Sequence, residues 1–297
     1  MIGSPGSGKT MIARRIPSIL PPMSVEEALE VSKIHSVAGR EKGGGMFVTS
    51  RPFRAPHHTV SSIGLLGGGT KPLPGEVSLA HRGVLFLDEF AEFPRPALEV
   101  LRQPLEDGHV SVSRAAAALD FPSRFMLVAA MNPCPCGYYN DPTHECRCNQ
   151  RQILKYQHRV SGPLLDRIDI QCEITPVPFN DISKAQPGEP SAAIRERVIK
   201  ARQVQENRFK NVHGVYCNAQ MSERMIHEYA EPDETGINLL RMAMERLKLS
   251  ARAYNRILKV ARTIADLEGT PHVQSHHLAE AIGYRNLDRG DWAERGV

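Results

Sequence analysis

The chain has 297 residues, of which 41% are hydrophobic and 24% are charged, and its formal net charge is +4. This length suits one large domain or two ordinary ones, and the composition is typical of a soluble globular protein. The sequence has no run of about 18 apolar residues, which excludes a membrane-spanning helix. A glycine-rich loop stands where a signal peptide would carry its apolar core, so we expect a cytoplasmic protein.

The first ten residues, MIGSPGSGKT, contain the pattern G-x-x-x-x-G-K-[ST]. In such a loop the glycines let backbone N–H groups face nucleotide phosphates, the lysine places a positive charge there, and the final hydroxyl holds Mg²⁺. The alternative interpretation is a glycine-rich turn with a solvated lysine. The predicted nucleotide-binding residues, called the phosphate loop below, are Gly3, Ser4, Pro5, Gly6, Ser7, Gly8, Lys9 and Thr10.

Helices are expected over Met11–Ile19 and Val25–Ala38, and the stretch GVLFLDEF (Gly83–Phe90) follows them. A short apolar run that ends in two acids is typical of a buried parallel strand. Asp88 would complete a magnesium shell together with Thr10, and Glu89 would polarise the attacking water. An acidic pair at a strand end is commonly just solvated, but with the phosphate loop it predicts a site for a nucleoside triphosphate and Mg²⁺.

The next segment is expected to form a helix over Pro96–Leu105 and then a hairpin within Glu106–Ala115. The pair Asp107-Gly108 is typical of a tight hairpin turn, and Val110 and Val112 alternate with polar residues as in a strand. We therefore place the turn of this hairpin at residues 107–108.

Two further strands are expected, over FMLVAAMNP (Phe125–Pro133) and DRIDIQCEI (Asp166–Ile174). Asn132 ends the first of these, where a polar residue would orient the attacking water, although Asn-Pro after a strand is also a common turn. Strands that alternate with helices predict an α/β fold with a mostly parallel sheet and flanking helices.

A proline-rich stretch, Thr175–Ser191, separates the alternating strands and helices from a part with helical patterns alone. Beyond it, AAIRERVIKARQVQENRF, ETGINLLRMAMERLKL, SARAYNRILKVARTIADLEG and HHLAEAIGY all have helical patterns. We therefore predict an α/β core over residues 1–175, a linker over 176–190 and a small all-helical domain over 191–297.

Four of the six cysteines form the pattern C-x-C…C-x-C, and these are Cys134, Cys136, Cys146 and Cys148. Four thiolates suit tetrahedral zinc, although the usual spacing is C-x₂₋₄-C, and four reduced structural thiols are the alternative. His144 is a substitute ligand, whereas Cys172 and Cys217 are expected to be core thiols.

The pair His57-His58 also suggests a metal site, but adjacent residues of an extended segment point in opposite directions. We interpret the glycine-rich region around this pair as an inserted element that, by resemblance to ring-forming helicases, is expected to face a pore. The hairpin resembles the element that such helicases insert into the channel of their ring. By that resemblance His109 and Arg114 are candidate contacts for a DNA backbone, although Arg114 is equally consistent with a solvated charge.

Long stretches of the sequence, taken together, resemble the magnesium-chelatase-like AAA+ proteins of the YifB/ComM type. They are GSPGSGKTM, RPFRAPHHTVSSIGLLGGG, PGEVSLAHRGVLFLDEF, LEDGHVSVSRA, FPSRFMLVAAMNPCPCGYY and SGPLLDRID, and the C-terminal helical stretches agree with them. The resemblance implies a P-loop NTPase (AAA+) core followed by a helical lid, and an ATPase that assembles into a homo-oligomeric ring, typically of six subunits.

The resemblance also implies roles for particular residues. It makes Asn132 the sensor-1 residue, Arg167 the arginine finger that reaches the neighbouring subunit's γ-phosphate, and Arg252 the sensor-2 residue, with Arg256 as the fallback. From the residues alone, an intrachain ion pair with a nearby acid is an equal interpretation of Arg167.

The resemblance implies a motor that remodels or translocates along DNA, as in branch migration. One alternative is a magnesium-chelatase-type motor that acts on a partner protein. Family members carry a Lon-protease-like N-terminal domain and a strand before the phosphate loop, so we expect a truncated protein, and an inactive fragment is the other alternative.

Overall fold

The computed structural model describes residues 1–39, 47–69, 72–114, 117–177, 181, 188–247 and 249–285. The chain divides into two compact units. The first, called the sheet unit, comprises Met1–Ser18, Pro22–Arg167 and Glu173–Ala185, and the second, called the helical unit, comprises Ile19–Pro21, Ile168–Cys172 and Gln186–Val297. Most of the predicted linker (178–180 and 182–187) lies outside the described residues.

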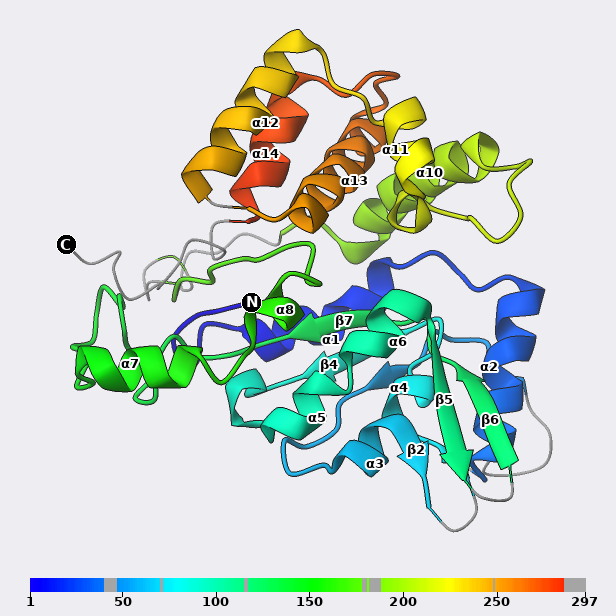
Figure 1. The fold of residues 1–297 in the computed structure, drawn as a ribbon, viewed down its shortest axis with the longest axis horizontal. Coiled ribbons are helices and arrows are strands. Elements are labelled where there is room, and N and C mark those ends of the chain that lie inside the picture. Colours follow the sequence, from blue (N-terminus) through cyan, green and yellow to red (C-terminus); the bar gives the residue numbers. More distant parts are fainter. Residues whose placement is uncertain are drawn as a thin grey trace. The chain divides into compact units, whose positions relative to one another are not determined.

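A parallel sheet with the strand order β1-β4-β7 forms the centre of the sheet unit (Figure 1). The central strand, β4 (Val84–Leu87), buries all four of its side chains, because it is paired on both edges and covered on both faces. It pairs in parallel with β1 (Phe53–Arg54) and with β7 (Met126–Ala129), so all three carboxyl ends lie at one edge of the sheet.

The chain beside β7 extends this parallel arrangement by two further segments. Ile2 makes parallel bridges to Met131 and to Glu173, and the Ile174 N–H donates to the Ile2 carbonyl at 2.6 Å. The strand predicted over Asp166–Ile174 is therefore limited to the single bridge at Glu173, and residues 168–172 belong to the helical unit.

The first two predicted helices are present. α1 (Lys9–Ile19) begins two residues earlier than predicted, since Gly8 already accepts a helical hydrogen bond from the Ile12 N–H. α2 (Val25–Val37) begins with a capping box, in which Ser24 and Glu27 satisfy each other's backbone N–H groups.

The helix predicted over Pro96–Leu105 is broken into α5 (Arg95–Glu99) and α6 (Arg102–Asp107). Pro104 has no N–H to donate to the carbonyl of Val100, four residues earlier, and its ring would clash with that carbonyl, so a continuous helix cannot form. The remaining short elements of the sheet unit are α3 (Ser62–Leu66), β2 (Gly67–Gly68), β3 (Leu73–Pro74), α4 (Glu76–Leu79), η1 (Phe90–Glu92), α7 (Gln150–Gln157) and α8 (Gly162–Leu165).

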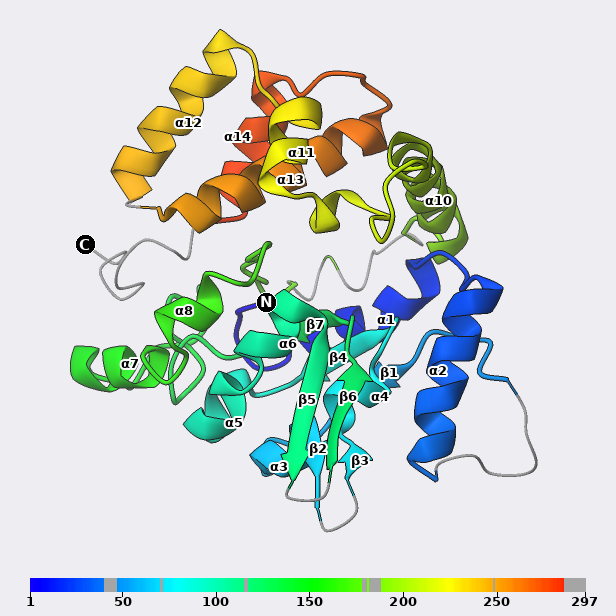
Figure 2. The ribbon, with the colours of Figure 1, turned by 45° about the vertical axis from the view of Figure 1, so that its right-hand side comes forward.

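A two-stranded hairpin extends away from the sheet (Figures 1 and 2). It consists of β5 (His109–Arg114) paired antiparallel with β6 (Ala117–Pro122), so the predicted hairpin is present but its turn is not at residues 107–108. Gly108 instead ends α6 in the left-handed conformation, with φ 69°, which glycine adopts without strain. The connection of the hairpin, residues 115–116, lies outside the described residues.

The helical unit consists of α10 (Ser191–Arg208), η2 (Asn218–Gln220), α11 (Glu223–Tyr229), α12 (Glu234–Leu247), α13 (Ala251–Glu268) and α14 (Ser275–Gly283). Its core contains one apolar face of α13, including Ile257, Leu258 and Ala261, packed against Leu240 and Leu278. The expected fold class, an α/β part with a parallel sheet followed by an all-helical part, is confirmed. None of the helices in the described part of the chain is both long and apolar enough to cross a lipid bilayer.

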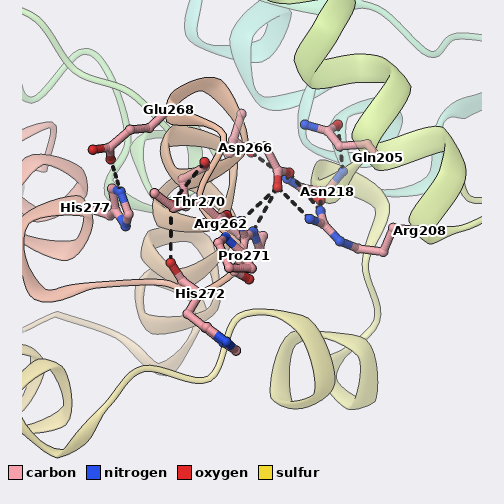
Figure 3. Close-up of polar contacts among 12 residues, drawn as sticks. Gln205, Arg208, Asn218, Arg262, Asp266, Glu268, Thr270, Pro271, His272 and His277 are labelled. Atoms are coloured by element: carbon pink, nitrogen blue, oxygen red, sulfur yellow. Dashed lines mark hydrogen bonds and ion pairs between the residues drawn. The ribbon is translucent and has the colours of Figure 1, made fainter.

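A buried carboxylate, Asp266, ties three segments of the helical unit together (Figure 3). Arg208 on α10 donates to both of its oxygens, at 2.8 and 2.5 Å, and Asn218 Nδ2 donates at 2.7 Å. Arg262, which is 1% exposed, donates to the same carboxylate and to the carbonyls of Thr270 and Pro271 beyond the end of α13. The carboxylate thus supplies the charge that lets two guanidinium groups be buried.

Asp266→Asn should destabilise the helical unit by about 3–5 kcal/mol, because it leaves buried arginines without their counter-charge. Amide hydrogen exchange along α13 and chemical denaturation of the whole protein measure this loss. Glu245→Gln, on the exposed surface of α12, is the control and should change stability by no more than about 0.5 kcal/mol.

The same substitution should remove a pH dependence. Burial raises the pKa of Asp266, but the hydrogen bonds from Arg208 and Asn218 and the charge of Arg262 outweigh it and leave the pKa below its ordinary value of 3.8. Stability from a lowered carboxyl pKa is present above the unfolded-state pKa and lost as pH falls through the folded-state pKa. The stability difference between the wild type and Asp266→Asn should shrink below about pH 4, and a difference constant with pH would contradict this.

Candidate nucleotide site and cysteine cluster

The phosphate loop leads from Ile2, beside β7, into the first turn of α1. Gly6 and Gly8 have φ of 78° and 89°, which glycine adopts without strain. A Cβ on Gly3 would lie 2.1 Å from the Ile174 carbonyl oxygen, so only glycine fits there. The N-terminus of an eleven-residue helix and the N–H groups of a glycine-rich loop form an environment suited to phosphate.

Lys9 lies inside this loop and is 8% exposed. Its Nζ donates to the carbonyls of Gly3 and Ser4, both at 2.7 Å, and to Ser7 Oγ at 3.3 Å. Burial lowers the pKa of Lys9, and the nearby Asp88 carboxylate partly opposes that shift. The loop therefore surrounds a lysine ammonium, which is the charge that phosphate oxygens need.

Thr10 and Asp88 come from distant parts of the sequence and meet at the carboxyl end of β4. Thr10 Oγ1 donates to Asp88 Oδ2 at 2.7 Å, and Asp88 Oδ1 accepts the backbone N–H of Glu89 at 3.0 Å. A hydroxyl and a carboxylate at this separation are hard oxygen ligands of the kind that Mg²⁺ prefers. The residues present therefore fit Mg²⁺ bound together with a nucleotide.

Asn132 follows β7 at the same edge of the sheet, and its Oδ1 lies 3.4 Å from Lys9 Nζ. The structure thus brings together the predicted residues Ser4, Lys9, Thr10, Asp88 and Asn132. The roles assigned to them stay predictions.

Glu89 directly follows Asp88 and has a left-handed backbone, with φ 53°. Its carboxylate is 57% exposed and lies 2.8 Å from His58 Nδ1. Sequence reasoning missed this pairing. It placed His57 and His58 on an extended segment with opposite directions, which was wrong, because the segment turns there and the two rings lie 4.1 Å apart.

Arg167 is held within its own chain. Its guanidinium forms an ion pair with Glu106 at 2.6 Å and donates to the Pro163 carbonyl at 2.6 Å. Glu106, near the end of α6, is thus an acidic partner of Arg167 that is distant in the sequence. Both residues line a surface pocket that also includes Glu99 and Arg102.

The two sensor-2 candidates lie on α13 in the helical unit. Arg252 is exposed in the first turn of the helix, and Arg256 forms an ion pair with Asp169 of the same unit. Arg256 is thus engaged in an ion pair within this unit, whereas the Arg252 side chain is exposed.

The four cysteines of the predicted metal site, called the cysteine cluster below, meet in one place: the ligand atoms of Cys134, Cys136, Cys146 and Cys148 all lie within 4.8 Å of one another. Three of the sulfur–sulfur separations are 3.4, 3.8 and 3.6 Å. Zinc–sulfur bonds of about 2.3 Å in a tetrahedron place sulfurs about 3.8 Å apart, so the donor set fits zinc.

The thiols of the cluster influence one another's protonation. Burial tends to raise the pKa of Cys136, but hydrogen bonds from the Tyr138 and Arg147 backbone and from neighbouring thiols lower it to about 6. Burial, together with the nearby Cys134 and Cys136, raises the pKa of Cys146 to about 12. A group of thiols that share protons in this way is stabilised by a bound cation.

The other predicted sulfur and histidine residues are placed elsewhere. His144 is not among the clustered ligands of the described residues, and its ring stacks on Tyr138 with centroids 4.8 Å apart. Cys172 and Cys217 are only partly buried, so the expectation of core thiols is not met.

A second group of metal-ligand types, Glu268, His276 and His277, occurs in the helical unit. Figure 3 shows two of its members, Glu268 and His277. His277 is fully buried, and its Nδ1 accepts the Gln274 N–H at 2.9 Å at the start of α14. Its Nε2 therefore carries the proton that is donated to Glu268. With both ring nitrogens engaged, this group is best explained as a helix cap.

Two family models match the chain in sequence order. "Magnesium chelatase, subunit ChlI" matches residues 1–182, and "Magnesium chelatase, subunit ChlI C-terminal" matches residues 188–285. The first match contains the phosphate loop, Asp88, Asn132 and the cysteine cluster, and the second contains α10 to α14.

Several relatives match nearly the whole chain, including the sheet unit and the helical unit. The chain is 46% identical to "Competence protein ComM" of Haemophilus influenzae and 45% identical to "Uncharacterized protein YifB" of Salmonella typhimurium, over 97% of its length in each case. It is 42% identical over 96% of its length to "Uncharacterized protein Rv2897c" of Mycobacterium tuberculosis. The chain spans about half the length of these relatives, 55% of the first and 56% of the others. These matches, together with the geometry above, show that the chain belongs to the magnesium chelatase subunit ChlI family of AAA+ proteins.

Proposed function

We propose that this chain is the ATP-hydrolysing part of an AAA+ motor that acts on DNA. The single observation that carries the proposal is the 2.7 Å contact between Thr10 at the start of α1 and Asp88 at the end of β4, next to the buried Lys9. Shared metal binding by these two side chains requires this closeness. The proposed ATPase core covers residues 1–175, and the proposed lid covers residues 191–297.

Each polar group has a proposed task in phosphoryl transfer, which depends mainly on positioning and charge stabilisation. The loop N–H groups and Lys9 would bind the phosphates. Thr10 and Asp88 would hold Mg²⁺, which would neutralise negative charge on the phosphates. Glu89 orients and polarises water, and Asn132 fixes the same water from the neighbouring strand. The 2.8 Å contact with His58 would hold the Glu89 carboxylate in place.

The assembly that we propose is a homo-oligomeric ring, typically a hexamer. In it Arg167 would leave Glu106 and reach the nucleotide of the next subunit, and Arg252, or else Arg256, would contact nucleotide from the lid. A guanidinium supplied in this way contributes a rate factor of about 10³ to 10⁵. The ion pair with Glu106 would keep Arg167 ordered until a neighbour arrives.

DNA is the partner that we favour, because one relative is named as a competence protein and the β5–β6 hairpin projects from the sheet unit. The compartment that we propose is the cytoplasm. Exposed His109 starts that hairpin and Arg114 ends its first strand. The family description also supports a second candidate, a chelatase-type motor that acts on a protein partner. ATP turnover stimulated by DNA favours the first function, and turnover stimulated only by chelatase partner subunits favours the second.

Glu89→Gln should leave ATP affinity intact and reduce turnover by about 10²- to 10⁴-fold, because it keeps the shape of the side chain but removes the basic carboxylate. Nucleotide binding and phosphate release, measured on the same preparation, separate the two effects. Glu92→Gln is the matched control, since this exposed glutamate lies three residues further on and pairs with Arg159. Normal turnover in Glu89→Gln would show that Glu89 does not have this role.

Arg114→Ala should weaken DNA binding and reduce the slope of log affinity against log salt by about one, as expected when one phosphate contact is lost. Fluorescence anisotropy with single- and double-stranded oligonucleotides over a range of salt concentrations measures both quantities. Arg197→Ala, which removes the same charge from α10 and breaks an exposed ion pair with Glu189, is the control. An unchanged salt slope in Arg114→Ala would remove the hairpin from the proposed DNA interface.

A further inference from the structure

The segment that carries the cysteine cluster lies directly against the phosphate loop. This segment, residues 133–149, is called the cysteine loop below. Ser4 Oγ donates a hydrogen bond to Asp141 in the middle of the cysteine loop. A Cβ on Gly137 would come within 2.7 Å of the ring of Pro5, so the Gly137 backbone packs against this ring with no room for a larger residue.

Asp141 is the central link between the two loops. Its side chain is 1% exposed, and its other oxygen accepts the Thr143 N–H at 2.8 Å, the Thr143 hydroxyl at 2.7 Å and the His144 N–H at 2.9 Å. One carboxylate thus fixes the turn that precedes Cys146 and also holds Ser4. Any change in the path of that turn moves the group that anchors Ser4.

Ser4 in turn shapes the part of the phosphate loop that surrounds Lys9. The Ser4 carbonyl accepts from Lys9 Nζ at 2.7 Å, while the Ser4 hydroxyl is held by Asp141. Phosphate binding depends on the direction of successive backbone N–H groups in this loop. The anchor at Ser4 therefore acts on the geometry that nucleotide binding requires.

The cysteine loop has no helix or strand between Pro133 and Asn149, all of which lie within the described residues. A segment without regular backbone pairing needs other constraints to hold one conformation. Its four thiol sulfurs converge, and a metal held by four thiolates supplies folding free energy to such a segment. Without the metal, the Asp141 contacts and turn hydrogen bonds such as Gly137 N–H to the Cys134 carbonyl and Asp141 N–H to the Tyr138 carbonyl would help to keep the shape of the cysteine loop.

We propose that metal bound at the cysteine cluster and nucleotide bound at the phosphate loop strengthen each other's binding, through the contacts of Asp141 with Ser4 and of Gly137 with Pro5. This inference rests on the proposed function, because it assumes that the phosphate loop binds ATP, and it takes the four converging thiols as a zinc site in addition. Binding linkage is reciprocal, so the two affinities must change by the same factor.

The test compares zinc-loaded and chelator-treated forms of the intact protein. The Kd of a fluorescent ATP analogue with Mg²⁺ should be about 5- to 150-fold lower for the zinc-loaded form, the usual range of coupling between two sites. The Kd of zinc, measured by competition with a chromophoric chelator, should fall by the same factor when the analogue is present. Visible absorption of the Co²⁺-substituted protein reports whether four thiolates bind the metal.

Asp141→Ala separates the linkage from folding of the metal site. It leaves all four cysteines in place, so the variant should still bind zinc, but zinc should no longer change its affinity for the ATP analogue. Glu145→Ala is the matched control, since it removes an exposed acid from the same loop and should keep the full effect. Near-normal far-ultraviolet circular dichroism of both variants identifies a folded chain.

The outcomes distinguish this inference from the proposed function. Equal affinities for the ATP analogue with and without zinc overturn the linkage while ATP binding itself stands. Full coupling in Asp141→Ala also overturns it, because the route through Ser4 is then wrong. A protein that binds no ATP analogue in either form overturns both the linkage and the proposed function.

Discussion

The hydrogen bond between Thr10 and Asp88 joins the start of α1 to the carboxyl end of β4. Asp88 has little freedom to move, because it directly follows a strand whose four residues are all buried. Thr10 is fixed in turn by the first turn of its helix. The contact therefore sets the phosphate loop over the end of the sheet, where Lys9, Glu89 and Asn132 add the remaining charge and hydrogen-bonding groups. The chemistry that we propose depends on this contact between Thr10 and Asp88 more than on any single side chain.

Two other sets of contacts order the parts of the chain around their own groups. The cysteine loop, which has no regular secondary structure of its own, contacts the phosphate loop at Ser4 and Pro5. The helical unit has a separate source of order, the Asp266 carboxylate that neutralises Arg208 and Arg262. The candidate site is thus organised around the Thr10–Asp88 contact, and the helical unit around the buried Asp266 carboxylate.

The sequence predicted features that depend on neighbouring residues. The phosphate loop, the buried strand before Asp88, the helix α2 and the convergence of the cysteines all follow from short patterns with a physical cause. It did not predict the pairing of His58 with Glu89 or of Arg167 with Glu106, because each joins segments that only the fold brings together. The hairpin turn was misplaced for a different reason: Asp107-Gly108 suits both a hairpin turn and a helix end. In the structure Gly108 ends α6, and its N–H donates to the Pro104 carbonyl.

The most direct test of the account is a double-mutant cycle on Thr10→Ala and Asp88→Asn, with Mg²⁺-dependent ATP binding as the measured quantity. If the two side chains hold one metal ion, the double variant should lose little more Mg²⁺-dependent affinity than either single variant, with an interaction energy of about 0.5–3 kcal/mol. Strictly additive losses would show that the two residues act independently. That result would contradict the shared nucleotide–metal site.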